Sequence, residues 1–346
     1  MKNPFLVLAS TVIISAIIPI GISIVMYKDE PKLKTVNTTK GNFKIETKLK
    51  LEKKEEIENY ERVDKISPII NVYNHKSKIV EKMDIEKYLC GVLAGEMSAE
   101  FNEEALKAQA IAARTYTIYS KDNKAHKDSD VCTNFKHCQE YKSKRELQRV
   151  NGILWINKYY PKIEQAVRDT KGQIMTYNNK PILPLYFSTS SGSTENSEEV
   201  FSTKYPYLRS VDSHYDKNAP KFSSCVKMSN LEFLQTLKKA YPSLTVSSKN
   251  LQKQINIKQR SVAGTVEKIK IGNIILKGRD IRSLFNLNSS NFDFNFYGNY
   301  INIFVKGYGH GVGMSQWGAQ GMANDGYNCY DILKHYYSNI NIKDIY

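Results

Sequence analysis

Cysteine and acidic residues are scarce in this chain of 346 residues. Its 5 cysteines are an odd number and a small fraction, which argues against a fold held together by disulfide bonds. Only 35 acidic residues oppose 50 lysines and arginines, so the formal net charge is +15. Such an excess predicts either polyanionic partners (nucleic acid, acidic wall polymers or a membrane surface) or an ordinary solvated basic surface.

The sequence also lacks the modules that read nucleic acids, and it shows no internal repeat of fixed period. It contains no RNP-like strand, no zinc-finger spacing followed by a helix and no basic heptad segment, so we expect no nucleic acid partner. Hydrophobic residues make up 41% of the chain, with 23 tyrosines and 13 phenylalanines. That is enough to fill the core of one large domain or two ordinary ones.

Charge is absent from residues 5–27, FLVLASTVIISAIIPIGISIVMY. At ~1.5 Å per residue this run spans a bilayer core, and it has no small-x-small cleavage site of a signal peptide. We predict a short cytoplasmic end at 1–4, an uncleaved single-pass transmembrane helix at 5–27, and a charged stalk at 28–65. An extracytoplasmic domain then occupies 66–346, and the protein is placed in the cell membrane.

Residues 84–120 contain a carboxylate where the pattern calls for an apolar side chain. Asp84 is a good N-cap for a helix that begins at Ile85. The stripe on one face of this helix consists of Ile85, Tyr88, Leu89 and Val92. Glu96 continues that stripe. Either the helix has already ended and Glu96 is solvated, or its carboxyl lies in a partly apolar wall, where desolvation raises its pKa as a general acid requires.

A second, alanine-rich helix is predicted after Asn102, which is a plausible N-cap. Lys107 and Arg114 are seven residues apart and therefore lie on one face of it. They are either ordinary surface cations or substrate-binding groups that face a cleft beside Glu96.

Three segments resemble the stage II sporulation protein D family of membrane-anchored peptidoglycan lytic transglycosylases. They are GEMSAEFNEEALKAQAIAARTY (95–116), FSTSSGSTENSEEVFSTKYPYLRSVDS (187–213) and GHGVGMSQWGAQGMA (309–323). They occur in the expected order, and the resemblance covers about residues 66–346. Ser98 stands where members often carry proline, and Ser191 where a second glycine is common.

The resemblance implies that Glu96 is the single catalytic acid of a glycan lyase. It would protonate the oxygen between N-acetylmuramic acid and N-acetylglucosamine. The carboxylate would then take the proton of the muramic acid 6-hydroxyl, whose oxygen closes a 1,6-anhydro end. No water attacks, so the second carboxylate of an ordinary glycosidase is not needed. Two alternatives are a noncatalytic peptidoglycan-binding scaffold of the engulfment complex and a zinc amidase or protease that uses His126 and His137.

The resemblance also implies a setting, which is cell wall degradation during forespore engulfment in sporulation. The substrate would be peptidoglycan strands already stripped of peptides, on the mother-cell side of the septal space. The implied partners are stage II sporulation protein P, an amidase, and stage II sporulation protein M.

Two loops are predicted to bind the sugars. FSTSSGSTEN (187–196) follows a strand-like run at 182–187, and its small hydroxyls and Gly192 suit a close approach to a glycan. The candidates there are Tyr186, Ser188, Ser190 and Ser191. A plain hairpin turn is the alternative.

The second loop is GYGHGVGMSQWGAQGMA (307–323). Its pattern predicts the end of a strand, then a glycine-rich loop, then the N-terminus of a helix. Ser315 and Gln316 would present that N-terminus to a sugar, and His310 would orient Ser315 or the substrate. A tight packing corner is the alternative. The loop lacks the ending of a phosphate-binding P-loop.

A metal site is predicted in an insertion at 121–160. The four candidate ligands are His126, Cys132, His137 and Cys138, a nitrogen and sulfur set that suits a closed, structural zinc site. A disulfide between Cys132 and Cys138, or unconnected surface residues, are the alternatives. Some members of the family carry a metal in this insertion, and the chemistry itself needs none.

The remaining residues combine helices with antiparallel hairpins. A helix should begin after Ser229, a hairpin should turn at Gly272-Asn273 before a helix near Asp280, and a strand should run through 299–308. We therefore predict an α+β fold, a single large mixed domain with a cleft between helical and sheet parts, unlike lysozyme.

Overall fold

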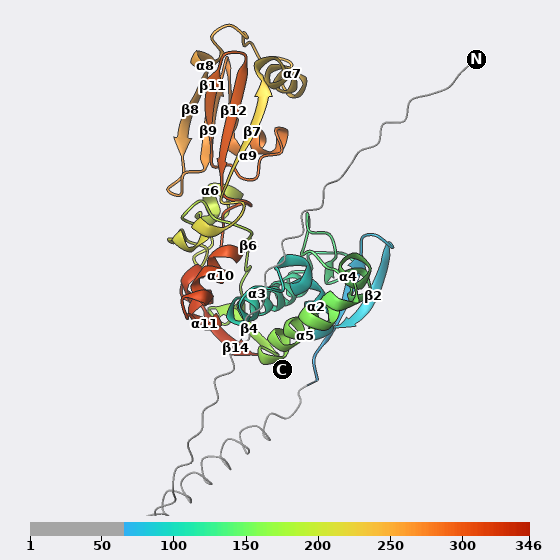
Figure 1. The fold of residues 1–346 in the computed structure, drawn as a ribbon. Coiled ribbons are helices and arrows are strands. Elements are labelled where there is room, and N and C mark those ends of the chain that lie inside the picture. Colours follow the sequence, from blue (N-terminus) through green and yellow to red (C-terminus); the bar gives the residue numbers. More distant parts are fainter. Residues whose placement is uncertain (1–65) are drawn as a thin grey trace, which may run out of the picture. The chain divides into compact units, whose positions relative to one another are not determined.

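A computed structural model describes residues 66–346 of the chain (Figure 1). The predicted cytoplasmic end (1–4), transmembrane helix (5–27) and stalk (28–65) lie outside the described residues. Between residues 66 and 346, no helix is both long enough and apolar enough to cross a membrane.

The helical part is built around α3 (Glu103–Asp122). The helices α2 (Ile85–Glu96), α5 (Ile153–Asp169), α10 (Gln316–Asn324) and α11 (Cys329–Tyr336) all pack against it. Asn102 caps α3 as predicted, because its side chain accepts a hydrogen bond from the Glu104 N–H at 3.0 Å. Ala105, Ala108 and Ala112 are completely buried, so their small side chains let the surrounding helices approach closely.

Two small sheets flank these helices. In the first, β1 (Ile69–Asn74) pairs with β2 (Ile79–Asp84) in antiparallel fashion and with β3 (Val131–Cys132) in parallel. In the second, β4 (Gln173–Tyr177) lies between β5 (Lys180–Pro181) and β14 (Asn341–Asp344). The short helix α4 (Lys144–Asn151) packs against α5.

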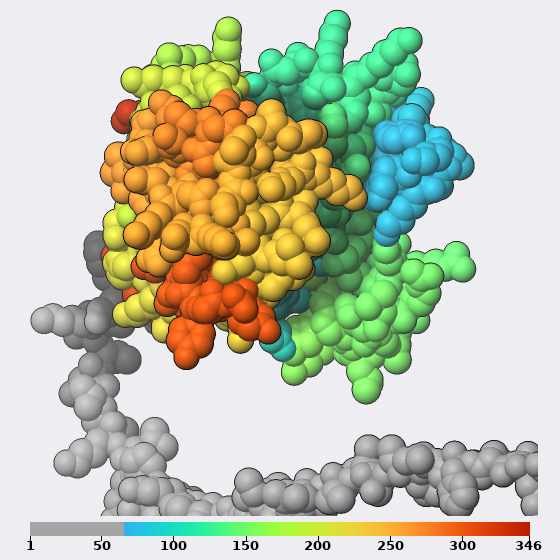
Figure 2. All heavy atoms as spheres, turned by 90° about the horizontal axis from the view of Figure 1, so that it is seen from above, coloured from blue at the N-terminus to red at the C-terminus, as the bar shows by residue number. Residues whose placement is uncertain are grey.

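The β-rich part contains two antiparallel three-stranded sheets. One has the order β10 (Ile274–Lys277), β9 (Val266–Ile271), β8 (Ile255–Arg260), and the other has the order β11 (Phe292–Tyr297), β12 (Tyr300–Lys306), β7 (Ser223–Ser229). Three helices accompany them, α7 (Asn230–Ala240), α8 (Leu251–Gln254) and α9 (Gly278–Leu284). Figure 2 shows the outer surface of this part in yellow to orange.

The local predictions for this β-rich part are confirmed. The Ser229 hydroxyl caps α7 by accepting a hydrogen bond from the Glu232 N–H at 3.1 Å. Gly272 and Asn273 separate β9 from β10, and Gly272 has a φ of +54°, a conformation that glycine adopts without the penalty of a side chain. Asp280 lies in the first turn of α9.

The predicted strand at 182–187 is shorter than expected. Only β6 (Tyr186–Phe187) forms, in parallel with β13 (Met314–Ser315). Proline at 181 and 184 explains this, because proline has no N–H to donate to a neighbouring strand. The helix α6 (Ser197–Phe201) and the 3₁₀ helix η1 (His214–Asn218) follow.

The mixed α and β class is confirmed. Residues 66–346 belong to one compact unit, yet its hydrophobic core divides into two clusters of buried side chains. One gathers around α2, α3, α5 and α11, and the other lies within the β-rich part. A cavity of about 340 Å³ is lined by α6 together with β9, β10 and α9, and Glu96 is not among its lining residues.

Candidate active site

Glu96 is the last residue of α2, so the helix does not end before it. The Asp84 side chain caps the helix by accepting a hydrogen bond from the Lys87 N–H at 3.1 Å. The predicted stripe of Ile85, Tyr88, Leu89 and Val92 is completely buried. Glu96 continues this stripe and is half-buried, as the second of the two interpretations of the sequence requires.

Burial raises the pKa of the Glu96 carboxyl from 4.5 to about 7. The Glu140 backbone N–H opposes this shift by donating to Oε1 of Glu96 at 2.6 Å. The negative charge of Glu140 raises the pKa further, whereas the side chains of Gln316 and Tyr186 lower it. A carboxyl with a pKa near neutrality can both give and take a proton, which suits general acid–base catalysis.

Two glycines of α2 allow the segment that carries Glu140 to approach. A Cβ atom added at Gly95 would lie 2.9 Å from the Glu140 carbonyl oxygen, and one added at Gly91 would lie 2.3 Å from the ring of Tyr141. Tyr141 stacks on Tyr88, with 5.5 Å between ring centroids. The contact between Glu140 and Glu96 therefore depends on bare backbone on one face of α2.

We expect Gly95→Ala to destabilise the protein by ~1–3 kcal/mol and to slow any reaction that uses Glu96, because the added methyl group pushes residue 140 away. Alanine is the better helix former, so helix propensity cannot cause such a loss. Urea denaturation and a rate assay would measure both effects. Ser98→Ala, at an exposed position just beyond the helix, is the control. Wild-type stability and rate in Gly95→Ala would contradict the packing argument.

Tyr186 and Gln316 come from distant segments and both lie close enough to Glu96 to alter its pKa. The Tyr186 hydroxyl donates to Oε1 of Gln139 at 2.8 Å, and Gln139 donates to the Thr117 hydroxyl at 3.3 Å. Nε2 of Gln316 is buried and has no hydrogen-bond partner within residues 66–346. A buried donor without a well-placed partner is rare in a folded protein, and the nearest charged acceptor is the Glu96 carboxylate, whose pKa this side chain lowers by hydrogen bonding.

The predicted sugar contacts of Ser190 and Ser315 are corrected by the structure. Both side chains are almost completely buried, and both hydroxyls donate to Asp216, at 2.8 Å and 2.5 Å. The Ser213 hydroxyl donates to the same carboxylate at 2.6 Å. Ser315 also caps α10 by accepting from the Gly318 N–H at 3.2 Å. These serines hold the two predicted loops together through Asp216 and have no surface to offer to a glycan.

The other loop candidates are more accessible, but they do not form one group. Ser188 is half-buried, and its hydroxyl lies 3.2 Å from the Thr189 hydroxyl. The Ser191 hydroxyl donates to the Ala263 carbonyl at 3.2 Å. Nδ1 of His310 accepts a hydrogen bond from the Val312 N–H at 3.1 Å, not from Ser315, and burial lowers the pKa of this imidazole to about 4. His310 is therefore neutral and lines the 340 Å³ cavity.

Lys107 and Arg114, which were predicted to bind substrate, both take part in ion pairs within the protein. Arg114 is completely buried, and its guanidinium donates twice to Glu86, at 2.8 Å and 2.6 Å. Lys107 pairs with Glu104 at 3.0 Å and with Asp169 at 3.3 Å. Arg114 has no surface left for a substrate, whereas Lys107 stays partly exposed beside its two carboxylate partners.

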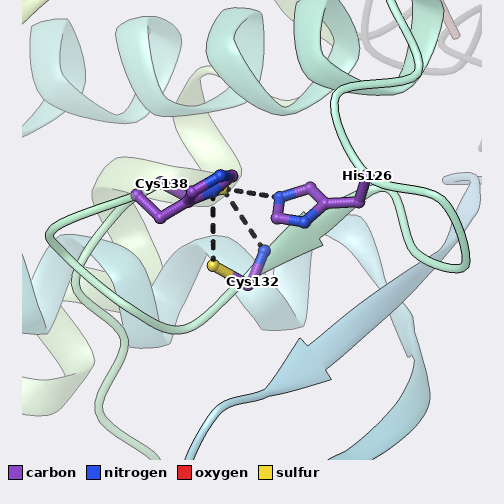
Figure 3. A group of neighbouring side chains, drawn as sticks. His126, Cys132 and Cys138 are labelled. Atoms are coloured by element: carbon purple, nitrogen blue, oxygen red, sulfur yellow. Dashed lines mark hydrogen bonds between the residues drawn. The ribbon is translucent and has the colours of Figure 1, made fainter.

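His126, Cys132, His137 and Cys138 do come together, with all their ligand atoms within 4.8 Å of one another. Nε2 of His126 lies 3.0 Å from Sγ of Cys138, and Nδ1 of His137 lies 3.5 Å from the same sulfur (Figure 3 shows three of the residues). Ligand atoms bonded at ~2.0–2.3 Å to one tetrahedral zinc ion are separated by ~3.3–3.8 Å. The nitrogen and sulfur donors, gathered within 4.8 Å of one another, are a set that fits a four-coordinate zinc ion. All five cysteines are free thiols.

The cluster of two histidines and two cysteines is connected to Glu96 through the two residues that follow Cys138. Cys138 is followed directly by Gln139, which binds Tyr186, and by Glu140, whose N–H binds Glu96. Whatever orders the cluster therefore also orders the surroundings of Glu96.

Sequence reasoning missed three acids, namely Asp216, Glu140 and Glu195. Glu195 is 2% exposed, and the hydroxyl groups of Ser261 and Thr265 lie near its carboxylate. Burial raises the pKa of Glu195 to about 7. It follows the serines in FSTSSGSTEN, so the signal for it was present in the motif, but hydroxyl groups were selected there and carboxylates were not.

Comparisons with known proteins agree with the family that the three segments resemble. Residues 73–177 match the family model described as SpoIID, stage II sporulation protein. The chain is 39% identical over 284 residues to stage II sporulation protein D of Bacillus subtilis (strain 168), an alignment that covers 81% of this chain and 80% of that protein. The homologue of the same name from Bacillus amyloliquefaciens matches to the same extent. A more distant relative, the amidase enhancer of Bacillus subtilis, is 26% identical over 307 residues, which cover 72% of this chain and 39% of that protein.

Proposed function

Because this chain belongs to the stage II sporulation protein D family, we propose that it is a lytic transglycosylase that cleaves the bond between N-acetylmuramic acid and N-acetylglucosamine. The observation that carries the proposal is the half-buried Glu96, whose pKa is raised to about 7 beside the amide of Gln316. Glu96 combines partial access with a proton available near neutral pH.

The chemistry needs one proton that leaves Glu96 and returns to it. The protonated carboxyl donates to the bridging oxygen, the C1–O bond breaks, and N-acetylglucosamine leaves as an alcohol. The carboxylate then accepts the proton of the muramic acid 6-hydroxyl, whose oxygen bonds to C1. The Glu140 N–H and the Gln316 amide stabilise the anion between the two steps. The product is a 1,6-anhydro end, and no water is consumed.

We further propose that His126, Cys132, His137 and Cys138 hold a structural zinc ion. Four protein ligands complete a tetrahedral shell and leave no position for water or substrate. The ion would stabilise the loop that leads to Glu140 and take no part in bond cleavage. A closed shell also disfavours a zinc amidase or protease, which needs an open coordination position.

The proposed setting is peptide-stripped peptidoglycan during forespore engulfment, reached from the membrane through the predicted helix at 5–27, on the mother-cell side of the septal space. Stage II sporulation proteins P and M remain proposed partners. The name of the distant relative, amidase enhancer, fits a role beside an amidase that removes stem peptides first.

The mass of the product tests the reaction class. We expect digestion of peptide-stripped glycan to give 1,6-anhydro ends, which are lighter by one water than hydrolysis products, and to give them equally with and without a chelator during a short assay. Reducing ends would assign a hydrolase, released peptides from intact peptidoglycan would assign an amidase, and binding without any product would assign a scaffold.

The pH dependence follows from the pKa of Glu96. Its proton-donating form disappears as the pH rises through about 7, so kcat/KM should fall by ~10-fold per pH unit above that value. The stability of the folded protein should also decrease as the pH rises. Between pH 4.5 and about 7 the folded state keeps a proton that the unfolded state releases, so the free energy of unfolding decreases as the pH rises.

Glu96→Gln should lack this component of the pH dependence of stability. The comparison with wild type also cancels the contribution of Glu195, whose pKa is raised to a similar value. A rate that is flat from pH 6 to 9 would contradict the assignment of Glu96 as the acid.

A further inference from the structure

One face of the sheet formed by β11, β12 and β7 is exposed and carries aromatic rings (Figure 1 shows the three strands). Side chains alternate between the two faces of a strand. In β12, Ile301, Ile303 and Val305 are buried in the core of the β-rich part. Tyr300 and Phe304 therefore lie on the opposite face, where each is 48% exposed. We call this face the outer sheet face, and the proposed reaction does not use it.

The register of the strands arranges the outer sheet face in three rows. The first row contains two rings, Tyr297 and Tyr300, which are directly opposite each other on β11 and β12. The third row contains Phe304, and at ~3.3 Å per residue it lies ~13 Å from the first row along the strand. The row between them is polar and consists of Asn295, Asn302 and Lys227.

The outer sheet face also carries positive charge. Lys227 and Lys306 are exposed, and neither makes an ion pair in the part of the chain that the structure describes. Asp293, an acid on this face, is paired with Arg260 at 2.6 Å. The Lys227 ammonium lies 4.9 Å from the centroid of the Tyr300 ring. The face is therefore complementary to an anionic ligand that can also contact rings.

A glycan strand has the groups that suit these rows. The C–H groups of a sugar pack on the negative face of an aromatic ring, and its hydroxyl and N-acetyl groups form hydrogen bonds with side-chain amides. A lipid bilayer suits the face less well, because insertion of the rings would also bury the amides of Asn295 and Asn302 without partners. A protein partner would need an apolar centre, but here a polar row separates the rings.

The outer sheet face is joined to one of the loops that were predicted to bind sugars. Beyond the end of β12, the backbone of Tyr308 exchanges two hydrogen bonds with Thr189, at 2.9 Å and 2.7 Å. Thr189 belongs to the loop FSTSSGSTEN (187–196). Tyr308 is itself exposed, and the Lys221 ammonium lies 4.4 Å from its ring centroid. The sheet and the loop are thus parts of one hydrogen-bonded framework.

We propose that the outer sheet face is an accessory binding surface for glycan strands, separate from the site at Glu96. The inference rests on the proposed function for the identity of the polymer, and it adds a second point of attachment. Two contacts on one polymer raise the effective concentration of the strand at the acid. A long strand gains from both contacts, whereas a short oligosaccharide occupies one of them at a time.

The test compares long peptide-stripped strands with a tetrasaccharide of the same repeat. Binding of the fluorescently labelled ligands is measured by anisotropy with the full-length chain in detergent, in a Glu96→Gln background so that the ligands stay intact. The parent protein should bind the long strands more tightly than the tetrasaccharide. The double variant Tyr300→Ala, Phe304→Ala should lower the ratio of the two affinities by ~10-fold.

Two sets of variants control this measurement. Tyr300→Phe and Phe304→Tyr keep a ring at each position and should keep the ratio of the parent. Tyr330→Ala removes an exposed tyrosine from α11, outside the sheet, and should also leave the ratio unchanged. Because Tyr300 and Phe304 are exposed, the double variant should melt at the temperature of the parent.

An unchanged ratio in the double variant would overturn the proposal. Binding to phosphatidylglycerol vesicles that depends on the two rings, while strand binding does not, would assign the face to a membrane. A dimer in sedimentation that becomes a monomer in the double variant would assign it to a second copy of the chain. The reaction is judged separately, from the product of the wild-type enzyme. Anhydro ends with an unchanged ratio would sink only the accessory surface, and a lowered ratio without anhydro ends would sink only the reaction.

Discussion

Glu96→Gln is expected to lower the rate of glycan cleavage by ~10³-fold, within the range of ~10²–10⁴ that one positioned acid–base group contributes. The amide cannot donate a proton to a leaving oxygen and cannot accept one from the 6-hydroxyl, so both halves of the reaction are lost. The change is nearly isosteric, and the amide oxygen can still accept the hydrogen bond from the Glu140 N–H. Binding of the glycan should therefore change little, and the loss should appear in kcat.

Glu100→Gln is the control, because Glu100 is exposed and its carboxylate accepts a hydrogen bond from the Tyr159 hydroxyl at 2.7 Å, away from Glu96. The rate is followed as the appearance of anhydro ends by mass spectrometry. Full activity in Glu96→Gln would remove the residue from its catalytic role. A loss of binding in proportion to the loss of rate would instead indicate that Glu96 only holds the substrate.

The environment of Glu96 was predictable because it depends on residues that are close to Glu96 in the sequence. Asp84 as a cap and four apolar residues at helical spacing place the carboxyl on the core face of α2, and both features require only neighbours in the chain. The cap of α7 and the turn at Gly272-Asn273 were predictable for the same reason.

The roles of the serines were not predictable, because they depend on partners far away in the chain. Ser190, Ser213 and Ser315 converge on Asp216, and a pattern of small hydroxyls is the same whether it binds a sugar or a buried carboxylate. Arg114 shows a similar limit. Its spacing from Lys107 predicts which face of the helix it lies on. The spacing does not predict that Glu86 of α2 packs against that face and accepts its hydrogen bonds. Gly91 and Gly95 appear ordinary within a helix until Tyr141 and Glu140 are packed against them.

Removal of the metal is expected to lower both stability and activity by a large amount. Cys138→Ser, or prolonged dialysis against a chelator, should lower the free energy of unfolding by roughly 3 kcal/mol or more, well inside the ~10–16 kcal/mol that structural zinc supplies to small domains. Activity should fall with it, because Gln139 and Glu140 follow Cys138 and position Tyr186 and Glu96. The melting temperature should drop by ~5–10 °C.

Cys225→Ser is the control, because Cys225 is an exposed thiol on β7, outside the cluster. One zinc ion per chain in the purified protein, lost in Cys138→Ser and retained in Cys225→Ser, would support the site. Zinc returned to the dialysed wild type should restore both melting temperature and rate, which separates a metal effect from irreversible damage.

The alternatives give opposite signatures. If Cys132 and Cys138 form a disulfide, a reductant lowers the melting temperature, a chelator does not, and the intact protein is lighter by two hydrogens. If the four residues are unconnected, neither treatment acts. A metal that is lost with a large change in rate but no change in stability would mean that the ion acts at the reacting atoms, which a shell of four protein ligands does not allow. The structural assignment therefore requires rate and stability to fall together, because the folded segment from Cys138 to Glu140 links the cluster to Glu96.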